Sequence, residues 1–333
     1  MLRIGYKASA EQFGPRELLG LAELAERLGY DSVFVSDHFQ PWRHTGGHAP
    51  FSLAWLGALG ARTSRILMGT SVLTPTFRYH PAIIAQAFAT LGALFPGRVI
   101  LGLGSGEALN ETPATALAWP EPRERTHRLR EALALIERLW REERVSFAGE
   151  YYRTERATIY DKPAEPVPIY VAAAGPVVAK LAGAHAAGFI STSGKPLELY
   201  RDTLLPALAA GLAESHRQAD AFERLIEMKV SFDTDRTLAL KDTRWWSALA
   251  LSGPDRDVHD PLEMERRADV LPLERIASRW IVSSDPEEQV ARIAPYVEMG
   301  FRHLVFHAPG PDQARFLSLY AEQVVPRLRK RFG

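Results

Sequence analysis

The sequence has 333 residues, with 40 basic and 40 acidic side chains and therefore no net charge. A chain of this length can bury a large core in one or two domains. A neutral chain is a poor candidate for a nucleic-acid-binding protein, which needs an excess of basic groups. The absence of cysteine excludes disulfides, thiolate metal sites, iron–sulfur clusters and a cysteine nucleophile.

Neither the start of the chain nor its most apolar window indicates a membrane protein. Residues 1–13 (MLRIGYKASAEQF) lack the charged segment and apolar run of a signal peptide. The window 169–190 is interrupted by Gly175-Pro176, Lys180 and His185, which predicts a strand, a turn and a helix. We therefore expect a soluble, cytoplasmic protein that does not bind membranes.

Eight short apolar runs alternate with amphipathic segments along the chain. The runs comprise residues 2–8, 31–37, 66–73, 99–106, 168–175, 188–194, 225–232 and 303–309. Apolar residues recur every three or four positions in residues 15–29, 51–63, 81–94, 123–141, 197–214, 286–300 and 313–331. This period is typical of helices that cover a sheet. The alternation predicts an α/β fold, a (β/α)₈ TIM barrel, rather than a doubly wound sheet, which usually has fewer strands.

Two segments interrupt the alternation. Residues 145–161, after the fourth expected strand, have the pattern of a small hairpin. Residues 233–285, after the seventh, form a long and partly helical excursion. The chain contains no internal repeat, low-complexity tract or evident linker, so we expect one domain, residues 1–333, that carries both insertions.

Ionisable and small side chains recur just after the expected strands, where (β/α)₈ barrels build their active sites. In chain order they are Glu11; Asp37, His38 and Trp42; Ser71, Val72 and Thr74; Ser105, Gly106, Glu107 and Asn110; Ala174 and Gly175; and Thr192 and Lys195. Their recurrence at one end of nearly every strand predicts a single site at that end of the barrel.

Each of these side chains also has a purely structural interpretation. His38 can exchange a proton at neutral pH or simply hydrogen-bond within its loop. Glu107 follows a glycine-rich turn that lets the backbone approach a ligand, or stabilises a helix N-terminus. Trp42 could stack on a ligand or belong to the core. Lys195 has the position of a phosphate ligand or that of a solvated surface lysine.

Other catalytic motifs fit the sequence less well. In GLGSGEAL the sixth position is Glu107, so the dinucleotide-binding pattern fails. Neither a G-x-S-x-G nor a Walker A motif occurs. A metal-dependent hydrolase is the alternative from another class, because His44 and His48 have metal-ligand spacing and could join Asp37 and His38. The first strand, however, lacks the histidine pair typical of barrel metallohydrolases, so we expect no metal.

Seven segments together resemble one family. They are YKASAEQF, VSDHFQPWRHTGGHAPFSLAW, GTSVLTPTFRYHPAIIAQAFAT, GEALNE, TSGK, RWIV and HLVFHAPG. They are similar to the F420-dependent glucose-6-phosphate dehydrogenases, which belong to the bacterial-luciferase-like superfamily of barrels. The similarity extends over essentially the whole chain and is most specific around residues 35–50.

The resemblance implies an oxidoreductase with the deazaflavin coenzyme F420 and a homodimeric assembly. It implies oxidation of glucose 6-phosphate at C1 to 6-phosphogluconolactone, with hydride transfer to C5 of the deazaflavin. It also implies a non-proline cis peptide bond between Ser71 and Val72. The implied cofactor contacts are Asp37, Ser71, Val72, Thr74, Ser105, Gly106, Asn110, Ala174, Gly175, Val177 and Val178.

Under this resemblance His38 takes the C1 hydroxyl proton and Glu107 supplies a proton near N1 of the deazaflavin. These two roles could be exchanged. Glu11 and Trp42 would shape the sugar pocket. Asp37 is not expected to orient His38, because neighbours in an extended chain point to opposite sides.

The sugar-phosphate contacts match only in part. Thr192, Lys195 and Arg279 match the resemblance, but Asp255-Arg256 stands where a Lys-His pair is expected. Arg256 could supply the missing charge with different geometry, whereas Asp255 would repel phosphate. One lost contact would cost about 1.5–3 kcal/mol. Another sugar 6-phosphate, such as fructose or mannose 6-phosphate, is therefore an alternative substrate. Two separate alternatives are a secondary alcohol, against which Lys195 and Arg279 argue, and a non-catalytic deazaflavin carrier.

Overall fold

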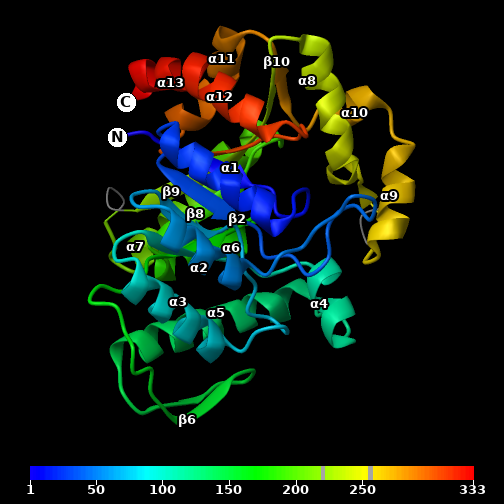
Figure 1. Ribbon diagram of the computed structural model, residues 1–333. Helices are drawn as coiled ribbons and strands as arrows, with labels where there is room; N and C mark the ends of the chain where they lie inside the picture. Colours follow the sequence, from blue (N-terminus) through cyan, green and yellow to red (C-terminus); the bar gives the residue numbers. More distant parts are fainter. Residues whose placement is uncertain (219–221, 254–257) are drawn as a thin grey trace.

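The computed structural model describes residues 1–218, 222–253 and 258–333. Its centre is a closed ring of eight strands, in which each neighbouring pair is parallel (Figure 1). In ring order the strands are β1 (Arg3–Ala8), β2 (Ser32–Val35), β3 (Leu67–Thr70), β4 (Val99–Leu103), β7 (Ile169–Ala172), β8 (Gly188–Thr192), β9 (Glu223–Phe232) and β11 (His303–His307). The pairing of β8 with β9 closes the ring, so the TIM barrel predicted from the sequence is confirmed.

The helices around this ring follow from their amphipathic sequences. In α1 (Pro15–Arg27), for example, Leu18, Ala22 and Ala25 are buried against the barrel at helical spacing. The other surrounding helices are α2 (Ser52–Arg62), α3 (Pro81–Leu94), α5 (Pro122–Arg141), α6 (Pro176–His185), η1 with α7 (Leu199–Leu204, Leu205–Glu214), α11 (Pro286–Glu298), α12 (Gln313–Gln323) and α13 (Val325–Phe332). Every helical segment expected from the periodicity is therefore present.

The strands are buried on both faces, which explains their nearly continuous apolar runs. Outward-facing residues pack against the helices in the main core. Inside the ring, a second cluster takes one residue from each of six strands: Phe34, Ile100, Tyr170, Ile190, Leu225 and Val305. Because these side chains pack inside the barrel, we expect a ligand to bind at the ends of the strands.

Both expected insertions are present. The antiparallel hairpin of β5 (Val145–Ala148) and β6 (Arg153–Ala157) follows α5. After β9, the chain forms α8 (Arg236–Asp242), η3 (Thr243–Ala250), α9 (Pro261–Asp269) and α10 (Leu273–Ala277). It returns as β10 (Ile281–Ser283), which pairs with the second half of β9. Figure 1 shows α8, α9 and α10 together on one side of the barrel.

The long loop after β2 is held against the second insertion. Arg43 forms ion pairs with Glu265 and Asp269 of α9 at 2.8 and 2.6 Å. The backbone N–H of Thr45 also donates to Glu265 Oε2 at 2.8 Å. A further short helix, α4 (Ala108–Thr115), follows β4 and faces the same end of the barrel. These contacts place the loops after β2, β4 and β9 around one end of the barrel.

Candidate active site

A cavity of about 300 Å³ lies at the carboxyl ends of the barrel strands. We call it the first cavity. Its wall contains many residues singled out from the sequence: Asp37, His38, Ser71, Val72, Thr74, Ser105, Gly106, Glu107, Asn110, Ala174, Thr192 and Lys195. Gly175, the N-cap residue of α6, and Val177 and Val178 in its first turn lie next to this wall, and Val177 is exposed. Most of the residues that were expected after the strand ends therefore lie together in this wall.

The backbone forms one side of the first cavity. The peptide bond between Ser71 and Val72 is cis, as the resemblance implies, and Lys7 Nζ donates to the Ser71 carbonyl at 2.7 Å. A Cβ at Gly104 would lie 2.7 Å from Val72 Cγ2, and one at Gly106 would lie 2.5 Å from Thr74 Cγ2. Because Gly106 also has a φ of +85°, a side chain there would be strained as well as crowded. Both positions therefore need glycine, because the backbone packs closely against Val72 and Thr74.

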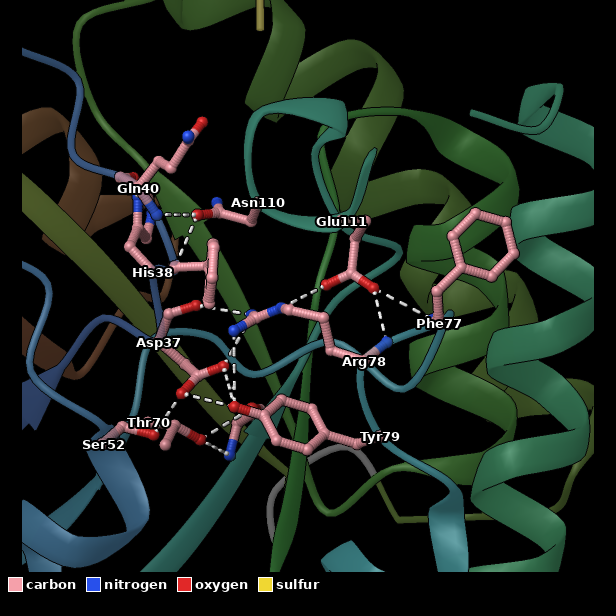
Figure 2. A network of polar contacts seen from close by, with 12 residues as sticks. Asp37, His38, Gln40, Ser52, Thr70, Phe77, Arg78, Tyr79, Asn110 and Glu111 are labelled. Carbon is pink, nitrogen blue, oxygen red and sulfur yellow. Dashed lines mark hydrogen bonds and ion pairs between the residues drawn. The ribbon is translucent and has the colours of Figure 1, made fainter. Parts of the chain in front are cut away.

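A buried network of charges supports the other side (Figure 2). Asp37 Oδ2 lies 2.8 Å from Arg78 Nη2 and accepts from the Tyr79 hydroxyl at 3.0 Å, while Ser52 donates to Asp37 Oδ1 at 2.6 Å. The same guanidinium donates from Nε to Glu111 at 2.8 Å. Burial alone would lower the pKa of Arg78, but Asp37 and Glu111 raise it above its ordinary value.

The sequence reading missed Arg78 and Glu111, although Arg78 lines the first cavity. Both residues lie inside the segments that carry the resemblance, but a local segment does not reveal that two distant charges pair.

Asn110 was expected at the site, and it lines the first cavity. Its Oδ1 accepts from the backbone N–H groups of Phe39 and Gln40 at 2.8 and 3.3 Å. Asn110 thereby fixes the loop that carries His38 to α4.

A second cavity of about 410 Å³ adjoins the first. The residues that line both are His38, Ser71, Glu107, Thr192, Lys195 and Glu227. The remaining wall of the second cavity includes Glu11 and Trp42, together with Trp246 and its neighbours from η3. The two cavities thus share a wall, and both side chains proposed to handle protons belong to it.

His38 is held by a buried carboxylate. Its Nε2 lies 3.3 Å from Glu11 Oε1, and its Nδ1 lies 3.2 Å from the carbonyl of Gln40. Ser36 donates to the other Glu11 oxygen at 2.7 Å. Burial would raise the pKa of Glu11, but His38, Lys7 and Ser36 lower it below its ordinary value. Glu11 is therefore a buried anion that positions the His38 ring.

The neighbouring Asp37 has a separate set of partners, as the alternation of an extended chain predicts. Trp42 lies beside His38, with 6.2 Å between the ring centroids, and packs against the insertion residues of η3 and α9. Its ring therefore contributes both to the wall of the second cavity and to the packing of that insertion.

Glu107 stands at the N-cap position of α4, but its side chain makes no capping hydrogen bond. Among the described residues, its Oε2 is a buried atom with no hydrogen-bond partner. A buried polar atom without a partner is unfavourable unless a ligand satisfies it. Because Glu107 lines both cavities, a ligand at their junction could supply that partner.

A second group of buried charges lies in the wall of the second cavity. Glu227 on β9 is 3.5 Å from Lys7 Nζ, 3.8 Å from Lys229 Nζ and 3.3 Å from His307 Nδ1. Burial would raise the pKa of Glu227, but Lys7, His307 and Lys229 hold it well below its ordinary value. Burial lowers the pKa of Lys229 to about 8, against the opposing effect of Glu227.

None of these four residues was proposed from the sequence. A signal was available, because Glu227 and Lys229 are charges at alternate positions in the middle of β9, where residues 225, 226, 228 and 230 are apolar. At strand period two, both side chains face the same side. Lys7 on β1 and His307 on β11 meet them because β9, β11 and β1 are adjacent in the ring.

The described residues include three of the four side chains expected to contact the sugar phosphate. Thr192, Lys195 and Arg279 all line the second cavity. Arg256 lies outside the described residues. His44 and His48, the candidates for a metal site, are exposed. In the described part of the chain, no group of three or more histidine, aspartate or glutamate side chains could hold a metal ion. No helix in that part has the length and apolarity needed to cross a membrane.

Known proteins match the chain over nearly its whole length. The family model described as "Luciferase-like monooxygenase" matches residues 2–303. The F420-dependent glucose-6-phosphate dehydrogenase of Nakamurella multipartita is 64% identical over 333 residues, which cover 100% of this chain and 98% of that protein. The protein of the same name from Mycolicibacterium smegmatis is 60% identical, with 99% of this chain and 98% of that protein covered.

A solved structure agrees with these sequence matches. An F420-dependent secondary alcohol dehydrogenase, in complex with an F420-acetone adduct, superposes with a TM-score of 0.92 at 32% identity. The superposition covers 98% of this chain and 99% of that one. The chain therefore belongs to the luciferase-like family and, within it, to the F420-dependent glucose-6-phosphate dehydrogenases.

Proposed function

We propose that this protein oxidises glucose 6-phosphate at C1 with coenzyme F420 as the hydride acceptor. The observation that carries the proposal is the shared wall between two adjoining cavities, which contains both His38 and Glu107. A cofactor in the first cavity and a sugar in the second would meet at these two side chains. The names of the close relatives support the same reaction.

The residues of the first cavity fit a flat ring system. Gly104 and Gly106 let the backbone lie close to Val72 and Thr74, so the wall carries no projecting side chain at these two positions. Glu107 offers a buried oxygen without a partner among the described residues. Bound F420 supplies a deazaflavin ring whose C5 accepts a hydride. The residues that would hold it are the first-cavity residues expected from the resemblance, with Gly175, Val177 and Val178 at the adjacent start of α6.

In the second cavity we assign His38 as the base. As the C1–H bond breaks with its electron pair, the C1 hydroxyl loses its proton to the imidazole and the sugar becomes the lactone. The Glu11 carboxylate, 3.3 Å from His38 Nε2, offsets the positive charge that the imidazole gains. Glu107 then provides a proton on the side of the first cavity. Trp42 and Trp246, which line the second cavity, would cover the sugar and exclude water.

Lys195 and Arg279 favour a phosphorylated sugar over a neutral alcohol. Both line the second cavity, and Arg279 lies near enough to Lys229 to lower its pKa. Cations gathered in this way are stabilised by an anionic substrate. The structurally similar secondary alcohol dehydrogenase makes a neutral alcohol the second candidate substrate.

The direct test mixes purified protein with F420 and follows the visible absorbance of the deazaflavin. Parallel reactions contain glucose 6-phosphate, fructose 6-phosphate, mannose 6-phosphate or a secondary alcohol. Rapid bleaching with glucose 6-phosphate alone is expected. Bleaching only with another sugar phosphate would move the assignment to that sugar, and bleaching only with the alcohol would overturn the phosphate assignment. Bleaching with none of them would contradict the proposed function.

We also propose that the protein acts in the cytoplasm as a homodimer, as the sequence leads us to expect. Light scattering during size-exclusion chromatography measures the assembly directly. A mass of twice 37.1 kDa supports the dimer, whereas a mass of 37.1 kDa contradicts it.

A further inference from the structure

Three basic residues lie between the second cavity and a third one. The third cavity, of about 380 Å³, is lined by residues 194–197 and 278–281, by Lys229, and by Arg292 and Tyr296 of α11. Among the described residues, three line both cavities: Lys195, Lys229 and Arg279. All three carry a basic side chain. Of the described residues in the wall of the third cavity, none has a carboxylate.

Lys229 differs from the other two because it is rigidly placed. It stands on β9, pairs in register with His307 on β11, and its backbone N–H donates to Ser193 Oγ at 2.8 Å. Its side chain is 6% exposed. A lysine so deeply buried is costly unless an anion is close.

The anion that the structure provides is shared. Glu227 lies 3.8 Å from Lys229 Nζ, which exceeds a normal hydrogen-bond distance, and is closer to Lys7 and to His307. Glu227 therefore does not neutralise Lys229 by a direct hydrogen bond. The position of Lys229 beside Lys195 and Arg279 is that of a group that meets a second anion in the cavity.

We propose that Lys229 binds the phosphate group of the substrate together with Lys195 and Arg279. The inference rests on the proposed function and adds to it a phosphate contact that the resemblance does not include. Lys229 then supplies a third cation in the described residues, in a molecule where Asp255-Arg256 replaces the Lys-His pair expected from the resemblance. The three cations come from the loop after β8, from β9, and from the residue before Trp280.

The groups that face Lys229 give the proposal a pH signature. They are Glu227 on its own strand, Lys7 on β1, His307 on β11, and Lys195 and Arg279 from the neighbouring loops. With a pKa of about 8 in the absence of substrate, Lys229 is mainly protonated at pH 7 and loses its charge as the pH rises further. The KM for glucose 6-phosphate should therefore rise above about pH 8, with a smaller change in kcat.

The test compares Lys229→Met, which keeps the length and removes the charge, with Lys229→Arg, which keeps the charge at all pH values. For Lys229→Met at pH 7 we expect the KM for glucose 6-phosphate to rise about 10- to 100-fold, with F420 affinity unchanged. Lys229→Arg should restore most of the affinity and flatten the rise of KM above pH 8. Lys180→Met removes an exposed lysine of α6 that pairs with Glu214 and serves as the control for general loss of charge.

Calorimetric titration with glucose 6-phosphate and with inorganic phosphate, without F420, separates this inference from the proposed function. Loss of both binding signals in Lys229→Met supports the phosphate contact. This result does not depend on the proposed function, because it does not require the wild-type protein to reduce F420 with any sugar phosphate. Unchanged phosphate binding in Lys229→Met, in a protein that still binds F420, would overturn it. An equal loss in Lys180→Met would also overturn it, because the effect would then be one of overall charge.

Discussion

The charged groups beside the first and second cavities have opposite compositions. Next to the first cavity, Arg78 lies between two carboxylates, Asp37 and Glu111. Each carboxylate also accepts hydrogen bonds from neighbouring hydroxyl or backbone N–H groups. Next to the second cavity, Glu227 lies between two lysines, Lys7 and Lys229. One region is an anionic framework with its acceptors satisfied, whereas the other has cations in excess.

This difference suggests different tasks for the two regions. A network whose hydrogen bonds are complete needs no ligand to stabilise it, so it can hold the wall of the first cavity in one shape. Buried cations that outnumber their carboxylate gain stability when an anion binds. The first region would therefore position a cofactor, and the second would select an anionic substrate that enters and leaves.

His38 lies where the two regions meet, and its removal should have the largest effect on activity. We expect His38→Ala to lower kcat about 10²- to 10⁴-fold, because the C1 hydroxyl proton loses its acceptor. F420 binding, followed by fluorescence quenching, should survive, since the network of Asp37 and Arg78 is intact. Unchanged turnover would show that His38 is not the base. Glu107→Gln is the matched variant, and the pH profiles of kcat/KM for the two would tell which residue is the acceptor.

Breaking the first network should mainly affect stability. Arg78→Met leaves Asp37 and Glu111 as buried carboxylates without their cation, so we expect a loss of about 3–5 kcal/mol in the free energy of unfolding. Urea denaturation measures this change. Arg62→Met is the control, because Arg62 is 61% exposed in its pair with Glu23 and should contribute about 0–1 kcal/mol. Equal effects of the two substitutions would contradict the contrast between the regions.

A loss of cation at the second cavity should instead affect substrate affinity. Lys195→Ala removes one of the proposed phosphate contacts, so we expect the KM for glucose 6-phosphate to rise about 10- to 100-fold. The stability of the fold and the affinity for F420 should change little. Steady-state kinetics at varied concentrations of glucose 6-phosphate measure this KM. An unaltered KM would contradict phosphate binding by Lys195.

The sequence predicted the barrel because its signals are local. Strands buried on both faces give continuous apolar runs, and the helices repeat with a period near 3.6. The site could be predicted to the extent that it follows the strand ends, as His38, Ser71, Glu107 and Thr192 do. The resemblance added the cis peptide bond at Ser71, which no periodicity would have revealed.

What the sequence did not reveal depends on contacts between distant residues. Glu111 forms an ion pair with Arg78, 33 positions away, and Glu227 reaches Lys7 only because β9, β11 and β1 lie side by side. The orientation of such charges is set by the closure of the ring rather than by any local pattern. Charges at alternate positions among apolar residues, such as Glu227 and Lys229 in the middle of β9, are the local feature that indicates such a group.

The smallest expected effect concerns the acid limb of stability. Because the folded protein holds the pKa of Glu227 well below its ordinary value, the ionised carboxylate stabilises the fold above the pKa of the unfolded chain. That stability is lost as the pH falls through the folded pKa. In Glu227→Gln this contribution is absent, so the free energy of unfolding should fall less steeply below about pH 4.5.

Each unit by which the pKa is lowered corresponds to about 1.4 kcal/mol of this pH-dependent stability. Urea denaturation at pH values from 7 to 3 measures the two slopes. Glu155→Gln is the control, because Glu155 is 80% exposed and should leave the slope unchanged. If Glu227→Gln also left it unchanged, Glu227 would not be the anion that the buried lysines share, and the excess of cations at the second cavity would need another counterion.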